Sequence, residues 1–220
     1  MKRRYHSPVK LVASTRNWIQ SEAVDQLFKT ARLEGVHRAV RLPDLHPGKG
    51  RPNGAAFVTE DVIYPHLIGD DVGCGMALWQ TGLPENPAQL ESWASRPFDL
   101  EHPWEGSMAD WIYAEGLIPS AFDSMMGTLG GGNHFAELQA VDQIVDSGAF
   151  RELGLVSHHL MMLIHSGSRG LGEMTQFGHS SQHGTEGLLA RSSEGLAFMS
   201  AHDQAVRWAR SNPSVPCWLE

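Results

Sequence analysis

Three short glycine-rich segments constrain this chain more than any other feature. They are GDDVGCGM at residues 69–76, GGGNHF at 130–135 and HSGSRG at 165–170. Each segment joins glycines to one or two metal-capable side chains at the end of an apolar run. Glycine lets a backbone approach a ligand closely and adopt a positive φ, and backbone N–H groups in such loops can hold a phosphate. The pattern therefore favours loops at strand ends that bind metal or phosphate.

The remaining sequence indicates a mixture of helices and strands. Helical spacing of the apolar residues Ile19, Ala23, Leu27 and Ala31 predicts one helix over 17–34. A second helix is predicted over 193–210. The short apolar runs AAFV, VIY and MALW lie between glycines and prolines, which is typical of strands joined by tight loops. Further strands are predicted over 134–141 and over the apolar run 160–164.

The stretch 173–192 is polar and rich in glycine, serine and histidine, and it is predicted to be a mobile surface loop. It contains His179 and His183 at i, i+4 spacing. That spacing brings two side chains together only on a helix. Both histidines are therefore interpreted as solvated loop residues.

Composition narrows the class of protein. A chain of 220 residues with 41% hydrophobic and 19% charged residues is expected to fold as one ordinary domain or two small ones. No apolar run reaches the roughly 18–20 residues of a membrane helix, and the basic N-terminus lacks the long apolar segment of a secretory signal. A cytoplasmic protein is therefore expected. The net charge of −8 argues against a broadly basic nucleic-acid surface but leaves room for a local basic pocket.

The cysteines are Cys74 and Cys217, and two cysteines in a chain of this length do not make a disulfide framework. Cys74 is interpreted as a free thiol or a ligand, with a buried cysteine in a glycine-rich turn as the alternative. Asp71 lies three residues before Cys74, so both side chains could reach one ion. Cysteine with histidine favours Zn²⁺, Mn²⁺, Fe²⁺ or Co²⁺ over Mg²⁺.

Two histidines and one arginine complete the candidates from the glycine-rich segments. His134 could be a metal ligand or a strand histidine whose hydrogen bonds are made within the protein. His165 could be a metal ligand or simply the residue that caps the end of a strand. Arg169, four residues after His165, could hold a phosphate through two hydrogen bonds.

In combination, four segments resemble the RtcB family of RNA ligases. They are PDLHPGKGRPNGAAF, GDDVGCGMALW, GTLGGGNHFAEL and HSGSRGLG, in the family's order and over about residues 10–210. GCGMALWQT and GGGNHFAELQ resemble most the branch linked to peptide chain release factor H. The resemblance implies an α+β fold with mixed β-sheets and surrounding helices.

The resemblance also implies an activity and a set of site residues. RtcB ligases join RNA ends bearing a 2′,3′-cyclic phosphate or 3′-phosphate to 5′-hydroxyl ends, using GTP and Mn²⁺ through a covalent histidine–GMP. By position, Asp71, Cys74 and His134 would hold one manganese, and Cys74 and His165 the second, with the thiolate bridging. Arg169 would bind a phosphate of the RNA or nucleotide. The remaining matches are the GTP-contacting residues Asn133, His134, Phe135, Ala136 and Glu137, and the possible accessory residues Asp44 and His46.

The chain departs from the family in length. Family members are nearly twice as long, and their C-terminal half carries a further metal-binding histidine, the rest of the guanine pocket and an HGAGR-type motif with the histidine that becomes guanylylated. None of these motifs occurs in the present sequence. The expectation is an N-terminal portion of an RtcB-like catalytic domain over 1–210 that is inactive alone. The segment 211–220, SNPSVPCWLE, is predicted to be an aberrant or out-of-frame tail in which Cys217 has no role.

Two other functions remain open at this point. One is a non-catalytic remnant that binds metal or a partner, which covalent labelling with GMP would exclude. The other is a stand-alone metallo-phosphoesterase that uses the four candidate ligands without GTP. The partners expected from the resemblance are RNA with broken ends, either ribosomal or transfer RNA, and a functional link to release factor H. No membrane is expected, and an exposed apolar core could cause self-association.

Overall fold

The computed structural model describes residues 9–11, 18–69, 71–86, 101–102 and 104–214. They divide into two compact units. Unit 1 contains the residues up to Ile68 together with 179–199, and unit 2 contains 69–178 and the residues from 200 onward. Cys217 lies outside the described residues. Helices and small sheets occur in both units, which confirms the predicted α+β class.

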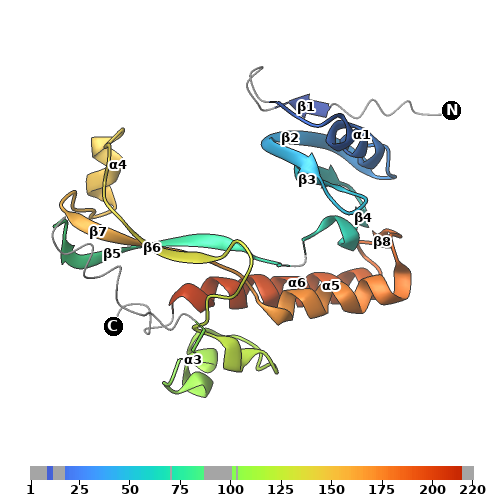
Figure 1. Ribbon diagram of the computed structural model, residues 1–220. Helices are drawn as coiled ribbons and strands as arrows, with labels where there is room; N and C mark the ends of the chain where they lie inside the picture. The colour runs from blue at the N-terminus through green and yellow to red at the C-terminus, as the bar shows by residue number, and fades with distance from the viewer. Residues whose placement is uncertain (1–8, 12–17, 70, 87–100, 103, 215–220) are drawn as a thin grey trace. The chain divides into compact units, whose positions relative to one another are not determined.

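Unit 1 is built on a three-stranded sheet in the order β1-β2-β3 (Figure 1). Strand β1 (Val9–Leu11) runs parallel to β2 (Val36–Pro47), whereas β3 (Pro52–Thr59) runs antiparallel to it. The sheet is therefore mixed, as the family resemblance implied. Helix α1 (Ser21–Thr30) packs beside this sheet and is shorter than the predicted span of 17–34.

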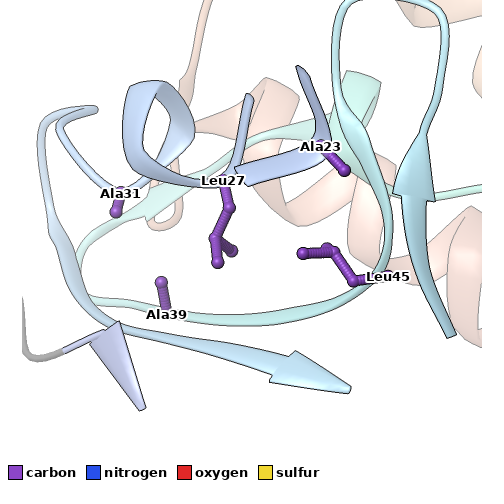
Figure 2. Close-up of a cluster of buried hydrophobic side chains, with 5 residues drawn as sticks. All are labelled: Ala23, Leu27, Ala31, Ala39 and Leu45. Carbon is purple, nitrogen blue, oxygen red and sulfur yellow. The ribbon is translucent and has the colours of Figure 1, made fainter. Parts of the chain in front are cut away.

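The helix and sheet of unit 1 are joined by small apolar side chains (Figure 2). Ala23, Leu27 and Ala31 follow one another at i, i+4 spacing, so they form a single stripe on α1. Ala23 and Leu27 are fully buried against Ala39 and Leu45 of β2. The predicted apolar face of the helix is thus confirmed for the residues that lie within α1.

Two short strands and one turn of 3₁₀ helix complete unit 1. Strand β4 (Val62–Ile63) pairs antiparallel with β8 (Leu188–Leu189), and η1 (Pro65–Leu67) follows β4. Strand β3 contains the predicted run AAFV, whereas β4 contains only the first two residues of VIY, and Tyr64 lies between β4 and η1.

Unit 2 contains a second three-stranded sheet in the order β5-β7-β6. Strands β5 (Gly75–Pro84) and β6 (Phe135–Gln139) both run antiparallel to the central strand β7 (His159–Ser166). Leu160 and Ile164 of β7 are almost fully buried. The other elements of the unit are α3 (Met108–Ala114), η2 (Asp123–Met125) and α4 (Ser147–Glu152).

Two long helices follow β7. They are α5 (Gly170–His183) and α6 (Ser193–Ser211), and η3 (Asn212–Ser214) continues from α6. The second helix confirms the prediction over 193–210. None of the helices in the described parts of the chain is both long and apolar enough to cross a membrane.

Helix α5 shows that the prediction of a loop over 173–192 was wrong for residues 173–183. Glycine in a helix costs only about 1 kcal/mol relative to alanine, and no proline interrupts residues 170–183. Leu171 and Gln176 are buried, so tertiary packing outweighs the weak helix propensity of the segment. His179 and His183 therefore lie on a helix, which removes the reason given for treating them as loop residues.

Candidate metal centre

The antiparallel pairing of unit 2 brings three candidate ligands to one edge of the sheet. Strands β5 and β6 both begin where β7 ends, because each runs antiparallel to it. Cys74 directly precedes β5, His134 directly precedes β6, and His165 is the second-last residue of β7. Residues separated by up to 91 positions in the sequence thus converge on one edge.

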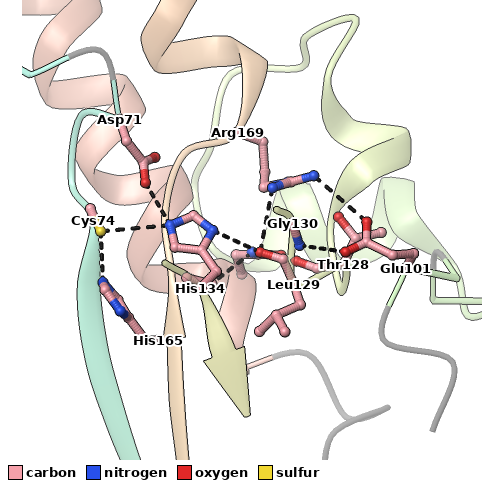
Figure 3. Close-up of polar contacts among 11 residues, drawn as sticks. Asp71, Cys74, Glu101, Thr128, Leu129, Gly130, His134, His165 and Arg169 are labelled. Atoms are coloured by element: carbon pink, nitrogen blue, oxygen red, sulfur yellow. Dashed lines mark hydrogen bonds and ion pairs between the residues drawn. The ribbon is translucent and has the colours of Figure 1, made fainter. Parts of the chain in front are cut away.

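The potential ligand atoms of Cys74, His134 and His165 all lie within 4.8 Å of one another. Figure 3 shows the Cys74 sulfur pointing toward both imidazoles. Its Sγ atom is 2.8 Å from Nε2 of His165 and 3.6 Å from Nε2 of His134. Cys74 is an exposed free cysteine, so the alternative of a buried structural cysteine is wrong.

Asp71 joins this group through His134. One carboxylate oxygen, Oδ2, lies 2.6 Å from Nε2 of His134. A turn sets its position, because the Cys74 N–H donates to the Asp71 carbonyl at 3.1 Å. The other oxygen, Oδ1, is buried and has no hydrogen-bond partner among the described residues. A Cβ at Gly167 would collide with this carboxylate, so glycine is required there.

The hydrogen bond made by Nδ1 decides which ring nitrogen of His134 carries a proton. Nδ1 lies 3.0 Å from the Leu129 carbonyl oxygen, which can only accept, so Nδ1 carries a proton. In a neutral ring, Nε2 then directs a lone pair at the Asp71 carboxylate and the Cys74 thiol. Electron-rich atoms this close require a proton or a cation between them. With the side chain of His134 only 5% exposed, a bound cation fits this arrangement.

The thiol of Cys74 is protonated at neutral pH in the absence of such a cation. Partial burial, together with the negative charge of Asp71 and a hydrogen bond to it, raises the pKa of Cys74 to about 11. A metal ion must displace this proton, since the thiolate is the ligand form. One sulfur, two imidazoles and one carboxylate form a donor set for Zn²⁺, Co²⁺, Fe²⁺ or Mn²⁺ rather than for Mg²⁺.

Arg169 lies beside the same group of residues. Its Nη1 donates to the Leu129 carbonyl at 3.4 Å, so one backbone oxygen accepts from both Arg169 and His134. Its Nη2 is 3.8 Å from Oε2 of Glu101, whose other carboxylate oxygen, Oε1, accepts from the Gly130 N–H at 3.0 Å. Gly130 permits this approach, because a Cβ there would overlap the guanidinium group. The candidate phosphate-binding arginine thus reaches the backbone that orients His134.

The predicted GTP-binding residues 133–137 do not all lie on one face. Phe135 pairs with His165 across β6 and β7, and the two rings are 5.5 Å apart. Glu137 lies two residues further along and shares this face, whereas Ala136 lies on the opposite face, paired with Ile164. Asn133 is exposed in the turn before the strand. A ligand on the face of His165 could reach Phe135 and Glu137 but not the Ala136 side chain.

The possible accessory residues Asp44 and His46 belong to unit 1, whereas the candidate ligands belong to unit 2. Both are exposed on β2. His46 bonds locally, with Nδ1 at 2.6 Å from the Asp44 carbonyl and Nε2 at 3.2 Å from the Asn53 amide.

Sequence reasoning missed several groups that support the candidate ligands. The Leu129 carbonyl orients His134 and Arg169, but a backbone oxygen has no sequence signature. Glu101 lies in a stretch rich in tryptophan and proline that carries no recognisable motif. Asn212 lies in the segment predicted to be an aberrant tail, where a buried asparagine cannot be foreseen from sequence.

Comparison with known proteins gives one family and several relatives. A family model described as "tRNA-splicing ligase RtcB" matches residues 26–98 and 119–215. The chain is 43% identical over 206 residues to RNA-splicing ligase RtcB2 of Escherichia coli strain ATCC 25922, covering 91% of this chain and 53% of that protein. It is 27% identical over 233 residues to RNA-splicing ligase RtcB of Escherichia coli strain K12, covering 87% of this chain and 54% of that protein. The chain thus spans about half the length of the curated relatives it matches.

Proposed function

The chain belongs to the RtcB family, and from that premise we propose that it carries the metal-holding part of an RNA ligase site. The proposed reaction joins RNA ends bearing a 2′,3′-cyclic phosphate or 3′-phosphate to 5′-hydroxyl ends, with GTP and Mn²⁺. The observation that carries this proposal is the convergence of Cys74, His134 and His165 within 4.8 Å. Both relatives are RNA-splicing ligases by name. The convergence of three metal-capable side chains from separate segments agrees with a ligase that uses metal ions.

The proposed ligand sets are those that the family resemblance implies, and the distances between the side chains support them. Asp71, Cys74 and His134 would hold one Mn²⁺, and Cys74 and His165 would contribute to a second. The Cys74 sulfur faces both imidazoles, which supports a thiolate shared between two positions. Bound Mn²⁺ supplies Lewis-acid stabilisation of charge on a transferring phosphoryl group.

The remaining proposed roles concern binding and orientation. Arg169 would hold an RNA or nucleotide phosphate with guanidinium N–H groups, because a planar guanidinium matches phosphate geometry. Phe135 and Glu137 would contact the nucleotide from the face of β6 that they share with His165. The Leu129 carbonyl would keep the Nδ1 proton on His134, so that Nε2 stays available as a ligand atom.

We further propose that these 220 residues bind metal but do not ligate RNA by themselves. The relatives are about twice as long, and the HGAGR-type motif that bears the guanylylated histidine in the family does not occur in this sequence. The proposed substrates are broken ribosomal or transfer RNA, with a functional link to release factor H. Self-association is also proposed, because Met76 and Leu78 are 63% and 52% exposed on the His165 face of the sheet.

One experiment separates these proposals. The 220-residue chain is titrated with Mn²⁺ by electron paramagnetic resonance, then incubated with labelled GTP and a pair of RNA fragments bearing 3′-phosphate and 5′-hydroxyl ends. We expect bound Mn²⁺, no covalent GMP and no joined RNA, with Mn²⁺ binding lost in Cys74→Ser. Absence of Mn²⁺ binding would contradict the proposed metal site. Release of the 3′-phosphate without GTP would favour a metallo-phosphoesterase, and joined RNA would contradict the proposed dependence on further residues.

A further inference from the structure

The side chain of Asn212 links two of the segments that carry candidate metal ligands. Asn212 is fully buried at the start of η3, directly after α6. Its Oδ1 accepts from the Gly127 N–H at 2.7 Å. Its Nδ2 donates to the Thr128 carbonyl at 3.1 Å and to the Ser166 hydroxyl at 3.1 Å. These partners also fix the orientation of the amide, because an N–H only donates and a carbonyl only accepts.

Two of these partners, Thr128 and Ser166, are adjacent in the chain to a group of the candidate metal centre. Thr128 precedes Leu129, whose carbonyl oxygen accepts from Nδ1 of His134. Ser166 follows His165 at the end of β7. A single amide therefore connects the backbone that orients one imidazole with the residue that follows the other imidazole.

The same end of α6 also contacts the loop that leads to Cys74. A Cβ placed on Gly73 would lie 2.8 Å from the Cβ of Ala209, so this loop packs directly on the helix. Gly73 has a φ of +78°, which favours glycine. The three ligand-bearing segments thus meet the last turn of α6 and η3, and Asn212 bonds to two of them.

We propose that Asn212 is a positioning residue that sets the spacing between His134 and His165. The inference rests on the proposed metal-binding function and adds to it a residue from the segment after α6. Asn212 acts on the two imidazoles through its bonds to Thr128 and Ser166, which adjoin Leu129 and His165 in the chain. Outer partners of metal ligands typically change metal affinity by about 10- to 100-fold when removed.

The neighbouring residue provides a matched control. Ser211 is also buried, and its hydroxyl accepts from Nε1 of Trp111 at 3.0 Å, on α3 rather than at the metal centre. Asn212→Ala and Ser211→Ala therefore each remove a buried polar partner at the same end of α6. The two variants are compared by thermal unfolding without metal and by Co²⁺ titration, with the absorption bands of bound Co²⁺ as the reporter of coordination geometry.

We expect both variants to unfold at a lower temperature than the original chain. Only Asn212→Ala should bind Co²⁺ about 10- to 100-fold more weakly, with shifted absorption bands. If a folded Asn212→Ala keeps the Co²⁺ affinity and absorption bands of the original chain, the inference is overturned and the proposed metal site is not affected. Absence of Co²⁺ binding to the original chain would overturn the proposed metal site and the inference with it.

A second variant tests the same link from its other end. Ser166→Ala removes the bond between the Ser166 hydroxyl and Asn212 and leaves the bonds to Gly127 and Thr128 in place. This variant should fold even where Asn212→Ala does not, because only one hydroxyl is lost. We expect a smaller loss of Co²⁺ affinity and a shift of the same bands. An unchanged spectrum in Ser166→Ala would contradict a link that runs through Ser166.

Discussion

The two three-stranded sheets of this molecule are held by different kinds of contact. In unit 1, the sheet packs on α1 through alkyl groups, and Ala23, Leu27 and Ala39 are fully buried (Figure 2). In unit 2, the edge where β7 ends beside the starts of β5 and β6 gathers a thiol, two imidazoles and a carboxylate (Figure 3). The packing of unit 1 depends on the volume of its apolar side chains. The candidate metal centre of unit 2 depends on the positions of single ligand atoms.

This difference indicates which substitutions each of the two regions should tolerate. A core of alanine and leucine accepts other side chains of similar volume at a modest cost in stability. The metal centre has no such latitude, because Gly130 and Gly167 leave no room for a Cβ beside Arg169 and Asp71. Substitutions in unit 1 should therefore change stability, whereas substitutions around the metal centre should change ligand binding.

The largest effect is expected for Cys74→Ser. The thiolate is the proposed shared ligand, so its loss should weaken Co²⁺ binding by more than the about 100-fold seen for loss of an outer partner. The thermal unfolding temperature without metal should change little, because Cys74 is exposed. Cys217→Ser is the matched control and should bind Co²⁺ normally. Unchanged Co²⁺ stoichiometry in Cys74→Ser would refute the bridging role.

Leu27→Ala in unit 1 should behave in the opposite way to Cys74→Ser, with a loss of stability and unchanged Co²⁺ binding. Leu27 is fully buried, so the substitution should lower the free energy of unfolding by about 2–5 kcal/mol. Co²⁺ affinity should stay the same at temperatures where the variant is folded, because no candidate ligand belongs to unit 1.

Leu196→Ala serves as the control for this comparison, since Leu196 is a helical leucine with 61% exposure. Chemical denaturation should show a change within about 0.5 kcal/mol for this control. Equal losses in the two variants would mean that the apolar cluster does not stabilise unit 1.

A smaller effect on the metal centre is expected for Gly167→Ala. The new Cβ would displace the Asp71 carboxylate from its place beside His134. Co²⁺ affinity should fall by about 10- to 100-fold. The control is Gly131→Ala, where a Cβ meets no atom within 4 Å. If both variants bind Co²⁺ alike in a calorimetric titration, Asp71 does not contribute to the site.

The smallest effect concerns pH. Because the pKa of Cys74 is raised to about 11, its thiol is protonated at neutral pH, and metal binding must release that proton. The apparent Co²⁺ affinity should therefore rise with pH, by up to about tenfold per unit between pH 7 and 8. Calorimetry in buffers of different ionisation enthalpy measures the protons released. Release of no proton by the original chain would show that the thiol is not displaced.

Sequence reasoning singled out the side chains of the candidate metal centre because their chemistry is unusual. Cys74, His134 and His165 stand out as metal-capable residues among glycines, and the family resemblance grouped them. The helix stripe of Ala23, Leu27 and Ala31 was equally visible, because its period matches the α-helix.

Other parts of the fold carry no such signal. The Leu129 carbonyl gains its role from His134 and Arg169, which lie 5 and 40 positions away in the chain. The buried amide of Asn212 gains its role from a contact with Thr128, 84 positions away. Helix α5 was mistaken for a loop because its glycines and serines have low helix propensity, and tertiary packing overrides that preference. The split of residues 133–137 between two faces of β6 appears only once the strand and its register are known.

The most direct test of the metal centre is X-ray absorption at the cobalt K-edge of the Co²⁺-loaded 220-residue chain. The arrangement of Cys74, His134 and His165 predicts one sulfur, at about 2.3 Å as for zinc thiolates, and imidazole nitrogens in the first shell. Cys74→Ser should lose the sulfur signal. A first shell of oxygen and nitrogen only in the original chain would contradict the proposal that these three side chains form one metal centre.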